Sequence, residues 1–183
     1  MIEPAEGILL ISDPFLKDPN FMRSVVLLCE HTEQGSFGLV LNRRTEHKLG
    51  HLIDTLPEIN FDVFYGGPVQ QDTLHFLHQL PNVIPNAQAL AKGIYWGGDF
   101  ETVIALLLKG ELDETKIRFY LGYSGWSSGQ LDDELKEKSW LTVQATRQLV
   151  FENDEQSIWK KSLLQMGGQY EQLVNYPIDP QLN

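Results

Sequence analysis

The segment GYSGWSSGQLDDEL (residues 122–135) contains the residue types most suited to chemistry in this sequence. The segment follows the alternating apolar stretch KIRFYL, which has the pattern of a strand. A strand followed by a glycine turn that carries a serine, and then by a helix, is the layout of a nucleophile elbow. In that layout a strained turn presents the serine hydroxyl for attack on an acyl group. The elbow pattern is G-x-S-x-G, whereas here Gly125 directly follows Ser124 and Trp126 takes the place of the second glycine.

The order of possible triad residues gives a second test of Ser124. In α/β-hydrolases the catalytic histidine comes after the serine along the chain. Here every histidine precedes Ser124, at positions 31, 47, 51, 75 and 78. Other triad orders exist, so this observation excludes one family of hydrolases only. We predict that Ser124 is not an activated nucleophile and that Gly122 and Gly125 serve the backbone.

Glycine-rich stretches can also bind phosphate groups, and the sequence contains two such stretches. After the first, Asp132, Asp133 and Glu134 fill the expected first turn of the helix, where they complement the helix dipole and repel an anion. No lysine follows those glycines, as a phosphate loop requires. The second stretch, FYGGPV (64–69), lacks a third glycine and a following helix. We therefore expect no nucleotide and no other cofactor.

Histidine and cysteine side chains give little indication of a metal site. His75 and His78 lie in TLHFLHQL, which has the pattern of a strand, and residues three apart in a strand point to opposite faces. Cys29 is close to His31, but it belongs to the most apolar run of the chain, so a buried, unreactive thiol is expected. We expect no metal ion.

Composition limits the classes of protein to which the chain can belong. A length of 183 residues suits a single domain, here expected over residues 1–183. The formal net charge of −11, without a concentrated basic face, argues against direct binding to nucleic acid or to an acidic membrane. There is no apolar run long enough to span a bilayer, and the start of the chain lacks the pattern of a signal peptide. A single cysteine fits a reducing cytoplasm.

The elements that position these residues follow from hydrophobic patterning. The pattern predicts helices over 48–56, from a cap at Asp99 to Gly110, after Ser127, and from Asn153 or Asp154 to Met166, followed by a loop at the end of the chain. It predicts strands over 7–12, 23–31, 37–42, 61–67, 73–80, 93–98, 116–123, 139–145 and 147–151. The first two strand pairs suit antiparallel pairing, and 93–123 suits a parallel crossover. We expect a mixed β-sheet flanked by helices, in the α+β or α/β class.

The glycine stretch itself is expected to form a structural corner between strand and helix. In this interpretation Gly125 adopts a conformation or close approach that a Cβ would obstruct, and Trp126 packs its ring against the sheet. Ser127 and Gln130 have the spacing of a capping box at the start of the helix.

Several stretches taken together resemble one bacterial family. They are GILLISDPFLKDPNFMRSVVLLCEH, GLVLNR, YGGPV, LHFLH, LGYSGWSSGQLDDEL, SW, FEND with a following W, and the closing DPQLN. In this order they are similar to the YqgE/AlgH family, also called UPF0301 or DUF179. The resemblance implies a single cytoplasmic domain with a mixed sheet, and it implies no known activity. Some members are called transcriptional regulators, a role that the charge of this chain makes indirect.

We therefore favour a binding or regulatory module that acts through a protein partner or a small ligand, rather than an enzyme. One alternative is an enzyme with a pocket near the glycine stretch, and the other is a DNA-binding transcriptional regulator. For ligand or partner binding, the expected residues are Asn42, Arg43, Tyr123, Ser124, Trp126 and Gln130.

Overall fold

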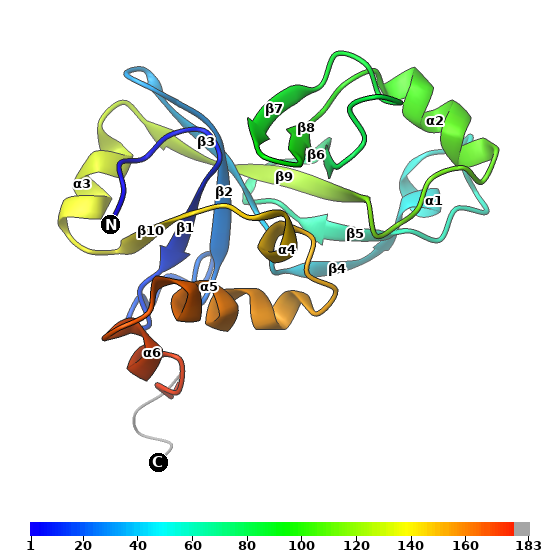
Figure 1. Cartoon of the computed structure of the whole chain (residues 1–183). Helices are drawn as coiled ribbons and strands as arrows, with labels where there is room; N and C mark the ends of the chain where they lie inside the picture. The colour runs from blue at the N-terminus through cyan, green and yellow to red at the C-terminus, as the bar shows by residue number, and fades with distance from the viewer. Residues whose placement is uncertain (178–183) are drawn as a thin grey trace.

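The computed structural model describes residues 1–177, and a curled mixed sheet dominates this range (Figure 1). The ten strands found there have the order β10-β1-β2-β3-β9-β6-β8-β7, with β5 beside β9 and β4 beside β5. Adjacent strands are antiparallel, except that β5 and β9 are parallel. The strands are β1 (Ile8–Ser12), β2 (Val25–Thr32), β3 (Gly35–Val40), β4 (Arg44–Lys48), β5 (Asp62–Tyr65), β6 (Val69–His78), β7 (Gln88–Ala91), β8 (Ile94–Trp96), β9 (Ile117–Ser127) and β10 (Trp140–Gln144).

Helices flank the sheet, so the expected α+β class with a mixed sheet is confirmed. They are α1 (Leu49–Leu52), α2 (Phe100–Leu108), α3 (Gln130–Lys136), α4 (Arg147–Val150), the 3₁₀ helix η1 (Glu155–Ser157), α5 (Ile158–Met166) and α6 (Tyr170–Leu173). Between residues 1 and 177 no helix combines the length and the apolar character that crossing a membrane requires.

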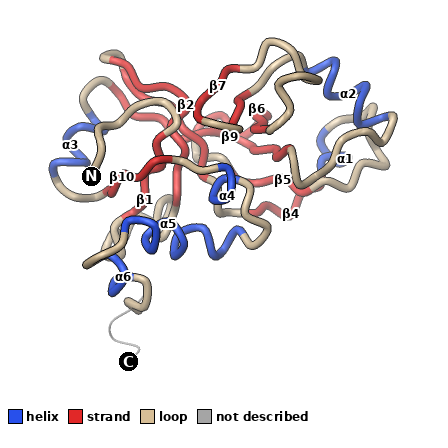
Figure 2. The backbone as a smooth tube through the Cα atoms, in the orientation of Figure 1, coloured by secondary structure: helices blue, strands red, loops and turns tan. Residues whose placement is uncertain are grey.

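Strand β9 joins the two halves of the molecule (Figure 2). Its first half lies between β5 and β6, and its second half pairs with β3 from Gly35↔Ser127 to Gly38↔Ser124. One half therefore contains β10, β1, β2 and β3 with α3, and the other contains β4 to β8 with α1 and α2 (Figure 1).

Alternating side chains of β1 and β2 reach two separate cores. Leu9, Leu27 and Cys29 belong to a cluster that α4 and α5 also enter, whereas Leu10 and Leu28 pack on the opposite face, toward α3. Both faces of these strands are thus covered, as the unbroken apolar run 25–29 predicts. A third cluster joins α1 and α2 to β5, β6 and β9.

The curl of the sheet brings its far end back toward the first strand. A Cβ added to Gly7, just before β1, would lie only 2.2 Å from the carbonyl oxygen of Leu90 in β7. Leu90 and Ile94 accordingly share a core cluster with Leu9 and Leu27. This curl encloses the core that supports the C-terminal helices.

Several predicted elements are confirmed, and three need correction. The hairpin of β2 and β3 is confirmed, and β8 and β9 run in the same direction on either side of β6, as a crossover requires. Residues 147–151 were expected to form a strand, but the Thr146 hydroxyl accepts a 3.3 Å hydrogen bond from the Leu149 N–H and caps helix α4. Such local capping outweighs β propensity in so short a segment.

The other two corrections concern strand lengths and missed strands. Strand β6 begins at Val69, within the expected loop GGPVQQD, and β9 continues through Ser127 instead of ending at Tyr123. Strands β4 and β7 were not predicted, because β4 (RTEHK) is polar and largely exposed, and β7 (QALA) is only four residues long with two alanines. The predicted C-terminal loop is described only to residue 177, and residues 178–183 lie outside the described range.

Candidate functional site

Ser124 lies in the middle of β9, and the expected corner is wrong. Its backbone is paired opposite Gly38, its side chain is fully buried, and its hydroxyl donates a 3.2 Å hydrogen bond to the carbonyl oxygen of Gly66. A nucleophile needs access to substrate and an adjacent base. The strand instead places this hydroxyl inside the protein, facing a main-chain carbonyl.

The glycines of GYSG and YGGPV fit against each other. Gly122 has a φ of +71°, and a Cβ there would lie 2.4 Å from the carbonyl oxygen of Gly67. A Cβ on Gly66 would lie 2.3 Å from the carbonyl oxygen of Gly122. Gly125 shows neither restriction, because its φ is not positive and a Cβ would make only ordinary contacts from 3.4 Å outward. The expectation for Gly125 is therefore wrong, and Gly122 is the position that requires glycine.

We expect Ser124 to remain unlabelled by a fluorophosphonate probe in the folded protein. The buried hydroxyl has no histidine among its hydrogen-bond partners, so no base can activate it. Mass spectrometry of the probe-treated protein measures the labelling, with a known serine hydrolase as a positive control. Stoichiometric labelling that disappears in Ser124→Ala would contradict the prediction.

Trp126 is buried and takes part in a small polar network beneath α3. Its side chain is 5% exposed, and its indole N–H donates a 2.8 Å hydrogen bond to Glu134 Oε2. Trp140 donates to the same oxygen at 2.8 Å, and the Gln130 amide donates to Glu134 Oε1 at 3.0 Å. Packing of the Trp126 ring is thus confirmed. Glu134 was predicted only as one of the charges in the first helical turn.

The predicted capping box between Ser127 and Gln130 forms only in part. Gln130 Oε1 accepts a 3.0 Å hydrogen bond from the Ser127 N–H, as the spacing predicts. However, Ser127 still belongs to β9, and the residue before the helix is Gly129, with a φ of +76°. The extended strand moves the helix start two residues beyond the expected cap.

Of the remaining predicted site residues, Asn42 and Arg43 both contact the loop before β2, whereas Tyr123 lines an open surface hollow beside Trp126. Asn42 accepts from the Val25 N–H at 3.0 Å and donates to the Arg23 carbonyl at 2.8 Å. Arg43 donates to two carbonyls of the loop before β2, and burial lowers its pKa. Tyr123 stacks on Phe37 at 4.5 Å between ring centroids. Ligand binding by these residues stays a prediction.

Histidine and cysteine residues form no metal cluster in the part of the chain that the structure describes. His78 is buried and contacts the Gly97 carbonyl at 2.8 Å, whereas His75 packs edge-on against Phe37. Cys29 is fully buried, and burial raises the pKa of its thiol well above the usual value. The thiol is therefore protonated and shielded at neutral pH.

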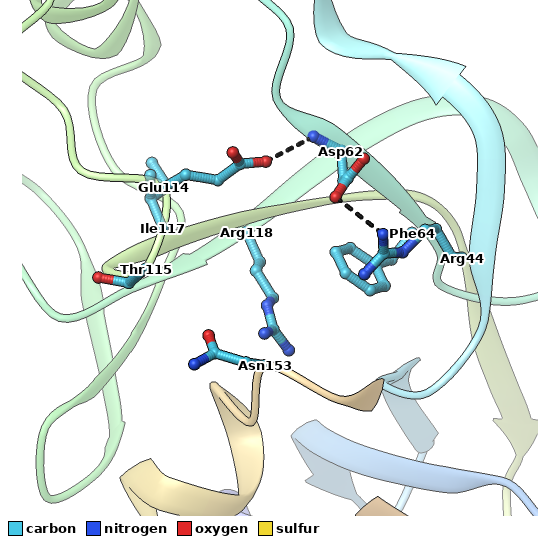
Figure 3. A pocket seen from close by; sticks show the side chains of 8 residues that line it. All are labelled: Arg44, Asp62, Phe64, Glu114, Thr115, Ile117, Arg118 and Asn153. Atoms are coloured by element: carbon cyan, nitrogen blue, oxygen red, sulfur yellow. Dashed lines mark hydrogen bonds and ion pairs between the residues drawn. The ribbon is translucent and has the colours of Figure 1, made fainter. Parts of the chain in front are cut away.

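A cavity of about 210 Å³ contains a different set of chemically active side chains (Figure 3). It lies where the start of β9 and the strands β4 and β5 meet the segment between α4 and η1. Its lining residues are Arg44, Asp62, Phe64, Glu114, Thr115, Ile117, Arg118 and Asn153. These residues come from segments distant in sequence, so only the fold brings them together.

Arg118 forms the floor of this cavity, and it is unusual because it is a charged side chain that is almost completely buried. Its side chain is 8% exposed, and its guanidinium donates hydrogen bonds to the carbonyl oxygens of Val150 and Glu152. Its guanidinium carbon lies 5.0 Å from the centroid of the Phe64 ring. Within residues 1–177, no carboxylate lies within 4.0 Å of it. Arg118 is thus a buried cation held by carbonyl dipoles and an aromatic face, with no carboxylate in direct contact in the described range. The pKa of the nearby Glu152 carboxylate is lowered mainly by its hydrogen bond from Lys161 and to a smaller extent by Arg118, so this carboxylate is already paired.

The other basic groups near the cavity are already neutralised. Arg44 forms ion pairs with Asp62 at 3.1 Å and with Glu155 at 2.9 Å, and Lys48 also contacts Asp62. Glu114 differs, because its Oε1 accepts a 2.7 Å hydrogen bond from the Asp62 N–H and no cation lies within 4.0 Å of it in the described range. The cavity therefore combines one ionic network with two separate opposite charges.

Sequence reasoning missed this cavity. Arg118 takes a polar position in the alternating stretch KIRFYL, which by itself predicts an exposed side chain. It is buried because the face of β9 that carries Arg118 and Tyr120 is covered as well. Glu114 and Asn153 carry no signal either, because both lie in polar turns.

Comparison with known proteins gives a consistent family. The AlgH-like family model (DUF179) matches residues 9–171. A UPF0301 protein of Chlorobium luteolum is 41% identical over 98% of this chain and 95% of its own length, and one of Bacteroides thetaiotaomicron is 41% identical over 98% and 92%.

Solved structures agree with this assignment. The solution structure of the AlgH protein from Pseudomonas aeruginosa, a UPF0301 member, aligns with a TM-score of 0.74 at 28% identity, covering 97% of this chain and 98% of that one. A crystal structure of a Corynebacterium diphtheriae protein shares the fold, with a TM-score of 0.79 at 22% identity over 96% and 94% of the two chains. The chain belongs to the AlgH-like family, UPF0301 or DUF179, whose biochemical activity these relatives do not specify.

Proposed function

We propose that this protein is a non-catalytic module that binds a small ligand through an anionic group at Arg118. One observation carries the proposal: a nearly buried guanidinium without a carboxylate partner in the described chain opens onto a cavity. Burying a charge is costly unless the charge is paired. An anionic ligand would supply the missing partner, and guanidinium binds carboxylate or phosphate through paired, charge-assisted hydrogen bonds.

The composition of the cavity favours binding over covalent catalysis. Its eight lining residues include no serine, cysteine or histidine, and Thr115, the one hydroxyl residue, is exposed. Asp62 is held by Arg44 and Lys48, so this carboxylate is not free to act as a general base.

The ligand-bound protein would act through a protein partner in the cytoplasm, without direct contact with nucleic acid or membrane. The formal charge of −11 supports this part of the proposal, because such a field repels phosphate-rich surfaces. The single, fully buried thiol is compatible with a reducing compartment.

Titration of the ¹⁵N-labelled protein with acetate and with inorganic phosphate tests ligand binding at Arg118. We expect saturable shifts of the Arg118 side-chain N–H signal and of the backbone amides of residues 114–118 and 153. Arg118→Met should abolish these shifts. The matched control is Arg147→Met, which removes the same charge from an exposed arginine without a side-chain hydrogen bond or ion pair in the described chain.

A second variant keeps the test valid if Arg118→Met fails to fold. Asn153 is exposed at the cavity and makes no side-chain hydrogen bond within residues 1–177, so Asn153→Trp should block the cavity without removing a contact. We expect the blocked variant to melt like the wild type and to lose the shifts. Absence of saturable shifts in the wild type, or their persistence in Asn153→Trp, would contradict the proposal.

A further inference from the structure

We infer that the ligand of this cavity is a small zwitterion the size of an amino acid, with its carboxylate at Arg118 and its ammonium group at Glu114. This inference rests on the function proposed above and adds the class of ligand. It begins from the Glu114 side chain, which lies in the same cavity as Arg118 and whose Oε2 makes no hydrogen bond or ion pair in the described range (Figure 3).

The charges around the cavity explain why a plain anion should bind there more weakly than a zwitterion. Arg44, Lys48, Asp62 and Glu155 compensate one another in a connected set of ion pairs. That leaves Arg118 and Glu114 as the two charges around the cavity without an ionic partner in residues 1–177. A ligand with only a negative group would gain the attraction of Arg118 and also meet the repulsion of Glu114. A zwitterion satisfies both.

The local backbone holds Arg118 in the buried part of the cavity and Glu114 at its exposed edge. Glu114 precedes β9 in a turn in which the Asp113 carboxylate accepts hydrogen bonds from the N–H and the hydroxyl of Thr115. Its Oε1 is held by the Asp62 N–H at 2.7 Å. Arg118 follows within β9 and is anchored from below by two carbonyls. Both charged ends are therefore positioned before a ligand arrives, which lowers the entropic cost of binding.

Size and wall chemistry limit the part of the ligand between its charged ends. A volume of about 210 Å³ is below the usual range for drug-sized ligands, about 300 to 1,000 Å³. Phe64 and Ile117 are buried and supply apolar wall, while Thr115 and Asn153 line the exposed side. A free amino acid with a small or branched apolar side chain suits this combination better than a nucleotide or a sugar phosphate.

Matched sets of compounds test the inference. Each apolar amino acid is titrated beside its des-amino carboxylate and its decarboxylated amine; for leucine these are 4-methylpentanoate and 3-methylbutylamine. The readout is the NMR shift of the Arg118 side chain and of the residue 114 amide. We expect at least one amino acid to bind about tenfold or more tightly than its des-amino analogue, the effect of one charge-assisted hydrogen bond.

Variants assign the preference to one carboxylate. Glu114→Gln should bring the amino acid down to the affinity of the des-amino carboxylate and leave binding of the carboxylate unchanged or stronger. Glu111→Gln is the matched control, because Glu111 is exposed in the same loop between α2 and β9 and makes no side-chain hydrogen bond or ion pair in the described chain. That variant should retain the wild-type preference.

The possible failures of the two proposals differ. Equal affinity for amino acids and their des-amino analogues, or a preference that survives Glu114→Gln, would overturn the zwitterion inference and leave anion binding at Arg118 standing. No binding of any carboxylate would overturn both. Binding of the amine alone as tightly as the amino acid, unaffected by Arg118→Met, would contradict the proposed role of Arg118.

Discussion

Replacing Gly122 with alanine is expected to lower the free energy of unfolding by about 2 to 5 kcal/mol. Two costs contribute to this figure. A φ of +71° costs a residue with a Cβ about 1 to 2 kcal/mol. The new methyl group would also lie 2.4 Å from the carbonyl oxygen of Gly67, and relief of such overpacking costs about 1 to 3 kcal/mol. Because Gly67 and Gly66 are themselves packed against β9, the strand cannot move away locally.

Gly125→Ala is the matched control, three residues further along the same strand. Gly125 is exposed, its φ is not positive, and a Cβ there would reach only the Tyr123 ring at 3.4 Å. We expect a change within about 0.5 kcal/mol, as for other surface substitutions. Chemical denaturation of both variants measures the difference. Equal midpoints for Gly122→Ala and the wild type would show that the contact between the two glycine motifs is not needed for stability.

The strands of the sheet could be predicted largely from the sequence, because apolar patterning is a local property. The run 25–29 predicts a strand buried on both faces, and that is how β2 packs, with Leu27 and Leu28 in different cores. Hydrophobic patterning failed in segments whose secondary structure depends on a local capping contact or on pairing at the edge of the sheet. Thr146 caps a helix in a segment that has β propensity, and β4 pairs at the sheet margin despite its polar composition.

The glycine motif shows a different limit. The sequence indicates that a glycine is required in GYSG, but not which one, since φ and close approach depend on the partner segment. That partner is YGGPV, more than fifty residues earlier, and it selects Gly122 rather than Gly125. The strand consequently continues past Ser124, and the turn lies at Gly129.

The candidate binding site could not be predicted from the sequence, because its main feature is that Arg118 has no carboxylate in contact with it in the described chain. Arg118 is informative only once every nearby carboxylate in the described chain is known to be further than 4.0 Å away or engaged elsewhere. Glu114 reaches the same cavity through the turn before β9, and Asn153 through the segment after α4. The spacing of these three residues along the sequence does not indicate that they line one cavity.

Truncating Trp126 to alanine is expected to lower the free energy of unfolding by about 3 to 5 kcal/mol, the usual cost for a buried aromatic ring. The indole is 5% exposed and packs between Phe21 and Trp140, with ring centroids 6.2 and 6.0 Å away. This loss is large against a typical total of about 5 to 15 kcal/mol. It would also loosen α3, because Leu131 shares the same core cluster.

Two further variants separate ring packing from the hydrogen bond to Glu134. Trp126→Phe keeps an aromatic ring, but the ring is smaller and lacks the indole N–H. Glu134 still accepts from Trp140 and Gln130, so we expect the lost hydrogen bond to cost about 1 to 2 kcal/mol beyond the effect of the smaller ring. Ser124→Ala, on the same strand, should cost about 1 kcal/mol or less, because the Gly66 carbonyl still accepts from the Val40 N–H at 2.8 Å. Denaturant titrations of the three variants give the order Trp126→Ala, Trp126→Phe, Ser124→Ala. If Trp126→Ala kept the wild-type midpoint, its ring would not anchor α3 to the sheet, and recognition of a partner would become the better explanation for this residue.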